Sequence, residues 1–175
     1  MAKLVYPQAE HEQMIKAYIQ ECYDHGEMYI NGDGGCHLES DYQKWLKRQK
    51  QDHLGINLKE NFVPATTYFY LEGDKIIGTI NIRHCLNDFL LKQGGHIGYS
   101  ILPSMRKKGY ATAMLKEAIA FCKKWDIYPI LITCNKENIA SRKTIEKCGG
   151  KLENEYFNQT TKETRLRFWI GEEND

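Results

Sequence analysis

The sequence lacks several features that would assign it to a class of protein at once. It has no apolar run near the ~18 residues needed to cross a bilayer, and residues 1–7 contain no apolar stretch of signal-peptide length. Its six cysteines form no C-x-x-C pair, and proline is scarce. Such scattered cysteines are typical of reduced, mostly buried thiols in a cytoplasmic protein. We therefore expect a cytoplasmic location and no membrane partner.

A surplus of charge of one sign is also missing. The 24 Lys and Arg are balanced by 23 Asp and Glu, for a formal net charge of +1. A nucleic-acid partner is not expected, because phosphate contacts require clustered surplus cations. The spacing of His84, Cys85 and His96 matches no standard zinc site, so no metal is expected. The 175 residues, 42% of them apolar, are enough for one core, which predicts a single domain over 1–175.

Local periodicity predicts the order of helices and strands. Pro7 is placed to open a first helix, and Ser40 with Gln43 forms a capping box that opens a second. Further helices are expected at 111–122 and 138–147, and strands at 67–71, 76–82, 96–102, 129–134, 151–158 and 164–170. This order predicts an α/β protein of the α+β type, in which helices flank a mixed sheet.

The most informative segment is a basic turn between a strand and a helix. Arg106, Lys107 and Lys108 precede Gly109 at the start of the helix. The first amides of a helix have no intrahelical acceptor, and glycine lets an anion approach the backbone, so this turn is suited to bind phosphate. An ordinary solvated basic turn is the alternative. The Walker and G-x-G-x-x-G patterns are absent, so neither an NTPase nor a dinucleotide-dependent dehydrogenase is supported.

Two sequence patterns resemble those of a known family. The letters RKKGYA at 106–111 match the [RQ]-x-x-G-x-[GA] acyl-CoA signature of the GNAT superfamily of N-acetyltransferases. The letters NIAS at 138–141, followed by EKCG at 146–149, are similar to its second hallmark. The resemblance implies a GNAT-like fold with a mixed, mostly antiparallel central sheet, helices on both faces and an acyl-CoA-binding core at about 64–158.

The resemblance also implies a reaction. Acetyl-CoA is the expected co-substrate, and the acetyl group is expected to pass directly to a primary amine. The implied cofactor-binding residues are Ser100, Ile101, Leu102, Arg106, Lys107, Lys108, Gly109, Tyr110, Ala111, Thr112, Asn138 and Ser141. For Asn138, the alternative role is a helix N-cap, which is compatible with cofactor contact.

The catalytic groups are less well defined. His96 stands where the superfamily commonly has a glutamate base, and Tyr99 is placed to line the site; structural histidine and packing aromatic are the alternatives. Ile145 occupies the position of a common tyrosine acid, which leaves Tyr156 or water for that role. Cys134 is not expected to be a nucleophile, because no His/Asn partner motif accompanies it.

The acceptor is expected to be a small-molecule or peptide amine. Arg83, His84 and Asn87 follow a strand and either shape the acceptor pocket or simply end the strand. The loop at 24–39 contains Asp24, Glu27, Asp33 and Glu39, which either attract a cationic acceptor or are solvated. The alternative functions are a non-catalytic acyl-CoA-binding or sensing module and an unrelated α/β scaffold. Analogy with relatives suggests a homodimer.

Overall fold

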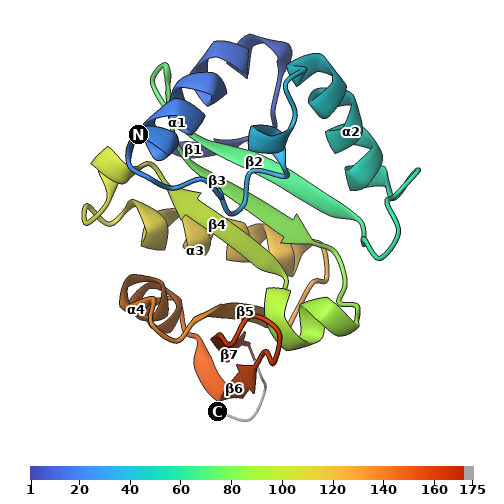
Figure 1. Cartoon of the computed structure of the whole chain (residues 1–175), viewed down its shortest axis with the longest axis vertical. Coiled ribbons are helices and arrows are strands. Elements are labelled where there is room, and N and C mark those ends of the chain that lie inside the picture. The colour runs from blue at the N-terminus through green and yellow to red at the C-terminus, as the bar shows by residue number, and fades with distance from the viewer. Residues whose placement is uncertain (172–175) are drawn as a thin grey trace.

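A computed structural model describes residues 1–171 and divides the strands between two antiparallel sheets (Figure 1). The first sheet contains β1 (Lys3–Val5), β2 (Ala65–Glu72), β3 (Lys75–Arg83) and β4 (Ile97–Ile101), in that order. The β-branched and aromatic residues of β2 and β3 form the predicted hairpin, with Tyr68 opposite Ile80. The last four residues of the predicted domain lie outside the described residues.

The second sheet has the order β5-β7-β6. Its strands are β5 (Ile130–Asn135), β6 (Lys151–Phe157) and β7 (Thr164–Ile170). The apolar run of β5 is buried, as its composition predicts, because β5 is covered on both faces. The predicted C-terminal hairpin is present as β6 and β7, with Phe157 opposite Thr164.

Helices cover both faces of the first sheet (Figure 1). On one face, α1 (Glu12–Asp24) and α2 (Tyr42–Leu54) pack against Phe69 and Ile76. On the other face, α3 (Tyr110–Lys124) packs against Ile80 and Ile82, and α4 (Ile139–Lys147) lies beside β5. Short turns of helix occur at η1 (Ala9–His11), η2 (Cys36–Leu38), η3 (Leu90–Gly94) and η4 (Pro103–Met105). The predicted fold class is confirmed.

Two predicted helix starts are wrong by one or more residues. The cap of α2 is Asp41, whose Oδ1 accepts the N–H of Lys44 at 3.2 Å, so Ser40 and Gln43 do not form the capping box. Pro7 does not open the first helix; Gln8 caps η1, and α1 follows from Glu12. At α2 the Asp41 side chain takes the cap because it satisfies an otherwise unpaired backbone N–H. Before α1, the N–H of Gln8 instead donates to the Nδ1 of His11 at 3.0 Å.

The cysteines are mostly buried, as their scattered positions predict. Cys22, Cys36, Cys122 and Cys134 are buried, Cys148 is intermediate and Cys85 is exposed. All six lie within the described residues, and none forms a disulfide there.

Candidate active site

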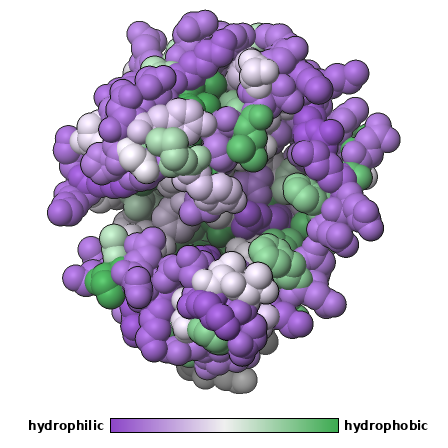
Figure 2. Space-filling view, in the orientation of Figure 1, coloured by the Kyte–Doolittle hydropathy of each residue, from purple (hydrophilic) through white to green (hydrophobic). Residues whose placement is uncertain are grey.

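The two sheets approach each other where β4 and β5 begin. The N–H of His96 donates to the carbonyl of Leu131 at 2.7 Å, just before β4. Farther along, β4 pairs with β3, with Tyr99 opposite Ile80. Among residues 1–171, β4 forms no ladder with β5, so its other edge is unpaired. The facing edge of β4 therefore presents backbone N–H and C=O groups to the space between the sheets. The space-filling view shows the molecule hollowed between its two halves (Figure 2).

The N-terminus of α3 is open. Gly109 has φ +85°, a conformation that side chains disfavour, and a Cβ built there would meet no atom within 4 Å. No side chain caps α3, and among residues 1–171 no acceptor bonds the amides of 107–112. These amides and the positive end of the helix macrodipole form a site with the chemistry and the room for a diphosphate.

Two predicted cofactor residues use their side chains elsewhere. The Arg106 guanidinium makes a bidentate ion pair with Glu27, both N–O distances being 2.7 Å, and its Nε donates to the carbonyl of Ile101. The hydroxyl of Tyr110 donates to Glu72 at 2.9 Å. These contacts fix the two ends of the basic turn and leave Lys107 and Lys108 exposed beside Gly109.

Predicted residues from β4 and α4 contact each other, and the end of α4 lies beside the first turn of α3, where the Cys148 thiol donates to the carbonyl of Thr112 at 3.7 Å. The hydroxyls of Tyr99 and Ser141 are 2.8 Å apart. The Oδ1 of Asn138 accepts the N–H of Ser141 at 3.1 Å, so Asn138 is the N-cap of α4. Burial raises the pKa of Tyr99 to about 12, so its hydroxyl stays protonated at neutral pH. Tyr99 can thus donate a hydrogen bond but not accept a proton.

His96 holds the two sheets together. Its Nδ1 accepts the N–H of Leu131 at 3.0 Å, and the residue is 7% exposed. Burial and, secondarily, the charge of Arg83 lower the pKa of His96 to about 4. The neutral ring then carries its proton on Nε2, and its lone pair on Nδ1 is already used. This geometry argues against the predicted base role and favours the structural alternative.

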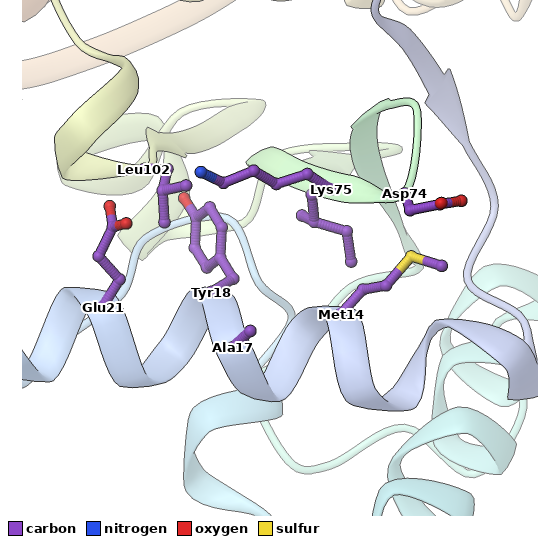
Figure 3. Close-up of a pocket in the computed structure, with 8 residues that line it drawn as sticks. Met14, Ala17, Tyr18, Glu21, Asp74, Lys75 and Leu102 are labelled. Atoms are coloured by element: carbon purple, nitrogen blue, oxygen red, sulfur yellow. The ribbon is translucent and has the colours of Figure 1, made fainter.

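Ser100 of β4 and Leu102, which follows the strand, face α1, whereas the Ile101 side chain packs in the core that contains α3 residues. The Ser100 hydroxyl lies 2.7 Å from that of Tyr18 and 3.0 Å from that of Thr79. The N–H of Leu102 donates to Ile77, and its side chain lines a small pocket together with residues of α1 and the β2–β3 turn (Figure 3). That pocket has a volume of about 130 Å³, whereas pockets for small-molecule ligands are typically about 300–1,000 Å³. It is too small for the nucleotide part of CoA.

The loop between α1 and α2 lies directly over β3 and β4. A Cβ on Gly32 would come within 2.6 Å of the Gly98 carbonyl and 2.8 Å of the Thr79 carbonyl. The backbone of the loop therefore touches the strand that carries Tyr99. An acceptor reaching β4 from this side must pass the loop.

The acids of this loop are satisfied locally. Glu27 pairs with Arg106, and buried Asp33 accepts from the N–H groups of Gly35 and His37 and lies 2.7 Å from the His37 Nδ1. Asp24 accepts from Gln20, and Glu39 accepts the N–H of Asp41. These contacts give the expectation of a cationic acceptor no support.

Of the three polar residues predicted near the acceptor, one lies over β4. A Cβ on Gly98 would be 3.1 Å from an Nη of Arg83, which places this guanidinium beside β4. His84 bonds Thr66 at 2.8 Å and packs edge-on against Trp125. The Oδ1 of Asn87 accepts the N–H of Leu90, the first residue of η3, so this side chain shapes η3 and not an acceptor pocket.

Ile145 and Cys134 have structural surroundings. Ile145 is fully buried in the core beneath α4, so its side chain is a packing group. Cys134 is 3% exposed, and burial raises the pKa of its thiol, which disfavours the thiolate needed for nucleophilic attack.

Sequence reasoning missed Arg165 and Thr133. An Nη of Arg165 donates to the Thr133 hydroxyl at 2.9 Å, and this hydroxyl donates to the carbonyl of Gln93. Arg165 alternates with core residues along β7, a pattern that predicts only an outward side chain. No local signal places it near β4. Among residues 1–171 no cluster of potential metal ligands is present, and none of the helices there could span a membrane.

Residues 33–150 match the family model described as the acetyltransferase (GNAT) family. No sequence among the curated proteins matches this chain.

Several solved acetyltransferases have a similar fold. The ribosomal-protein-S5-alanine acetyltransferase from Vibrio fischeri is 18% identical, with a TM-score of 0.71 over 99% of this chain and 93% of its own. RimL, a ribosomal L7/L12 α-N-protein acetyltransferase in complex with coenzyme A, is 14% identical, with a TM-score of 0.71 over 99% and 96%. The microcin C7 self-immunity acetyltransferase MccE, in complex with acetyl-CoA and AMP, is 16% identical, with a TM-score of 0.70 over 98% and 92%.

Proposed function

Because this chain belongs to the acetyltransferase (GNAT) family, we propose that it acetylates a primary amine by direct transfer from acetyl-CoA at the hollow between β4 and β5. The observation that carries this proposal is the uncapped N-terminus of α3 beside the unpaired edge of β4. The first supplies donors for a diphosphate, and the second supplies donors and acceptors for an extended amide-containing arm.

The proposed cofactor contacts are mainly with the backbone. The amides of 107–112 hold the diphosphate, and Lys107 and Lys108 add positive charge from the exposed side of the turn. Of Ser100, Ile101 and Leu102, we assign the backbone contact with the pantetheine arm to the N–H of Ile101. Neighbouring residues of a strand alternate in direction, and the Leu102 N–H donates to Ile77 of β3, so the Ile101 N–H points to the open edge of β4. The Leu102 carbonyl is engaged by Met105, and the Ile101 carbonyl is engaged by Arg106. Arg106 and Tyr110 contribute by fixing the turn through Glu27 and Glu72.

Acetyl-CoA supplies an activated acyl carbon, and the residues of the chain position the acceptor beside it. The acceptor nitrogen forms the new C–N bond, the C–S bond breaks, and the nitrogen loses one proton while the thiolate gains one. We assign proton removal to water, because the lone pair of His96 Nδ1 is engaged by Leu131. Tyr99 stays protonated and donates its hydrogen bond in the hollow, held in place by Ser141.

The test is acetylation of an amine panel with acetyl-CoA, followed by mass spectrometry of the acceptor and by titration of released CoA thiol. We expect thiol release to match acetylated amine in a one-to-one ratio. CoA binding without acetylation of any acceptor would instead support the non-catalytic sensing module. The homodimer and the cytoplasmic location stay predictions.

A further inference from the structure

Two arginines without carboxylate partners lie on the acceptor side of β4. Within residues 1–171, Arg106, Arg142 and Arg167 each form an ion pair with a glutamate. Arg83 and Arg165 form none in that part of the chain; their hydrogen bonds go to neutral oxygens. Arginine remains protonated in proteins, so both side chains bring positive charge to the site; Glu163 is within electrostatic range of Arg165 but forms no ion pair with it in the described structure.

The two guanidinium groups are neighbours. Arg83 donates to the carbonyl of Gly94 at 3.2 Å, while Arg165 donates to Thr133, whose hydroxyl donates to the carbonyl of Gln93. Because Gln93 and Gly94 are consecutive, the two side chains approach the same turn of η3 from β3 and β7. Burial lowers the pKa of Arg83, while the nearby Tyr29 raises it. The charge of Arg165 lowers the pKa of Arg83 further, as expected for like charges in proximity.

One donor of this pair is unused. The Nε of Arg165 is buried and has no hydrogen-bond partner in the described structure. A buried donor on a charged group costs free energy unless an acceptor reaches it, and an anion would satisfy both the donor and the charge.

The pair lies beside the reacting strand. The Arg83 guanidinium covers Gly98, the residue before Tyr99, and Thr133 precedes Cys134 on β5. The loop that contains Gly32 covers the same stretch of β4, and the exposed Tyr29 of this loop is within electrostatic range of both arginines.

We propose that Arg83 and Arg165 form an anion subsite in the acceptor pocket, and that the acceptor is an amine that also carries a carboxylate or phosphate group. This inference rests on the proposed acetyl transfer, because it names the acceptor class for the same hollow. The guanidinium pair binds the anionic group and thereby directs the amine nitrogen toward the acyl carbon. The satisfied acids of the α1–α2 loop leave these cations unneutralised.

The test compares amines that differ in one charged group. For a carboxylate, the rates with β-alanine and β-alaninamide are compared. For a phosphate, the rates with O-phosphoethanolamine and ethanolamine are compared. We expect kcat/KM to be at least about tenfold higher for the anionic member of one pair, since one charge-assisted hydrogen bond is worth about a factor of ten or more. The pair of amines that shows the preference identifies the anion. Equal rates, or a preference for the neutral member in both pairs, would overturn the proposal.

Arg83→Gln and Arg165→Gln are expected to remove this preference by raising KM for the anionic amine. Both variants lose the positive charge but keep a side-chain N–H donor. The control is Lys124→Gln, which removes one positive charge from the exposed end of α3. Arg165→Lys is expected to restore part of the preference. Thermal unfolding and CoA calorimetry verify folding. An equal loss of kcat on both members of a pair would assign the arginines to the developing oxyanion, and a loss of CoA affinity would assign them to the cofactor; either result contradicts the subsite.

A binding measurement separates this proposal from the enzymatic one. N-acetyl-β-alanine and N-acetyl-O-phosphoethanolamine are titrated into CoA-saturated protein, which requires no turnover. Binding of either product by the wild type, weakened about tenfold or more in the arginine variants, supports the subsite even if no amine is acetylated. Binding of neither product overturns it, whether or not neutral amines are acetylated.

Discussion

The Nδ1 of His96 accepts a hydrogen bond from the backbone N–H of Leu131 at 3.0 Å, across the point where the two sheets meet. Together with the bond from the His96 N–H to the Leu131 carbonyl, it fixes β4 against β5 at one end. The strands diverge from this junction, so the side chain that sequence reasoning offers as a base instead maintains the hollow in which the chemistry is proposed.

Replacing His96 tests the two roles. In His96→Asn the amide oxygen can accept the Leu131 N–H, whereas His96→Ala leaves this buried donor unsatisfied, at a cost of about 1–3 kcal/mol. We expect His96→Asn to keep most of the activity and His96→Ala to lower the free energy of unfolding, measured by denaturant titration. Loss of activity in both variants, with folding and CoA affinity intact, would restore the base assignment.

The buried His96 also predicts a pH dependence of stability. Its pKa is about 4 in the folded protein and ordinarily 6.5, so the unfolded chain binds more protons between these values. Stability is therefore expected to fall as the pH decreases from about 6.5 to about 4, with a contribution of about 3 kcal/mol from this group. Denaturant titrations across this range should show a shallower pH dependence for His96→Asn than for the wild type, and identical slopes would contradict the assignment.

The open turn before α3 predicts a selective effect on cofactor binding. Gly109→Ala places a methyl group where the diphosphate is proposed to lie, in a left-handed backbone that costs about 1–2 kcal/mol for a side chain. Gly73→Ala is the matched control, since Gly73 has φ +59° and open surroundings in the β2–β3 turn. We expect similar losses of stability, and a fall in CoA affinity, measured by calorimetry, in the Gly109 variant alone. Equal CoA affinities would argue against the phosphate site.

Tyr99 is expected to act as a hydrogen-bond donor. Tyr99→Phe removes the hydroxyl, and we expect kcat to fall about tenfold or more with CoA affinity retained. Ser141→Ala keeps the Tyr99 hydroxyl and removes its hydrogen-bond partner, so a smaller decrease in kcat is expected. Because the pKa of Tyr99 is about 12, its ionisation should produce no inflection in the rate profile below about pH 10. An unchanged kcat in Tyr99→Phe would remove Tyr99 from the reaction.

The ion pair of Arg106 with Glu27 is expected to connect the basic turn to the α1–α2 loop. Both side chains are partly exposed, so a double-mutant cycle with Arg106→Gln and Glu27→Gln should give a coupling of about 0.5–1 kcal/mol that weakens with salt. We expect CoA affinity to change little in Glu27→Gln. A large loss of affinity in Arg106→Gln alone would show that this guanidinium binds phosphate directly.

Several features of the site were predictable because their causes are local. The glycine and cations before α3 follow one another in the sequence, and Asn138 caps α4 through an amide three residues away. The capping box at Ser40 was wrong for an equally local reason: Asp41 is a competing cap one residue later, and sequence spacing does not decide between adjacent polar side chains.

The sequence by itself determined the order of the helices and of every strand except β1, the buried character of β5 and the open glycine turn, because periodicity and backbone preference act over a few residues. Only the tertiary structure decided that His96 joins Leu131 and that Arg83 meets Arg165 at η3. These pairs come from strands far apart in the chain. Their proximity depends on how the two sheets pack, and their chemistry depends on the burial that this packing imposes.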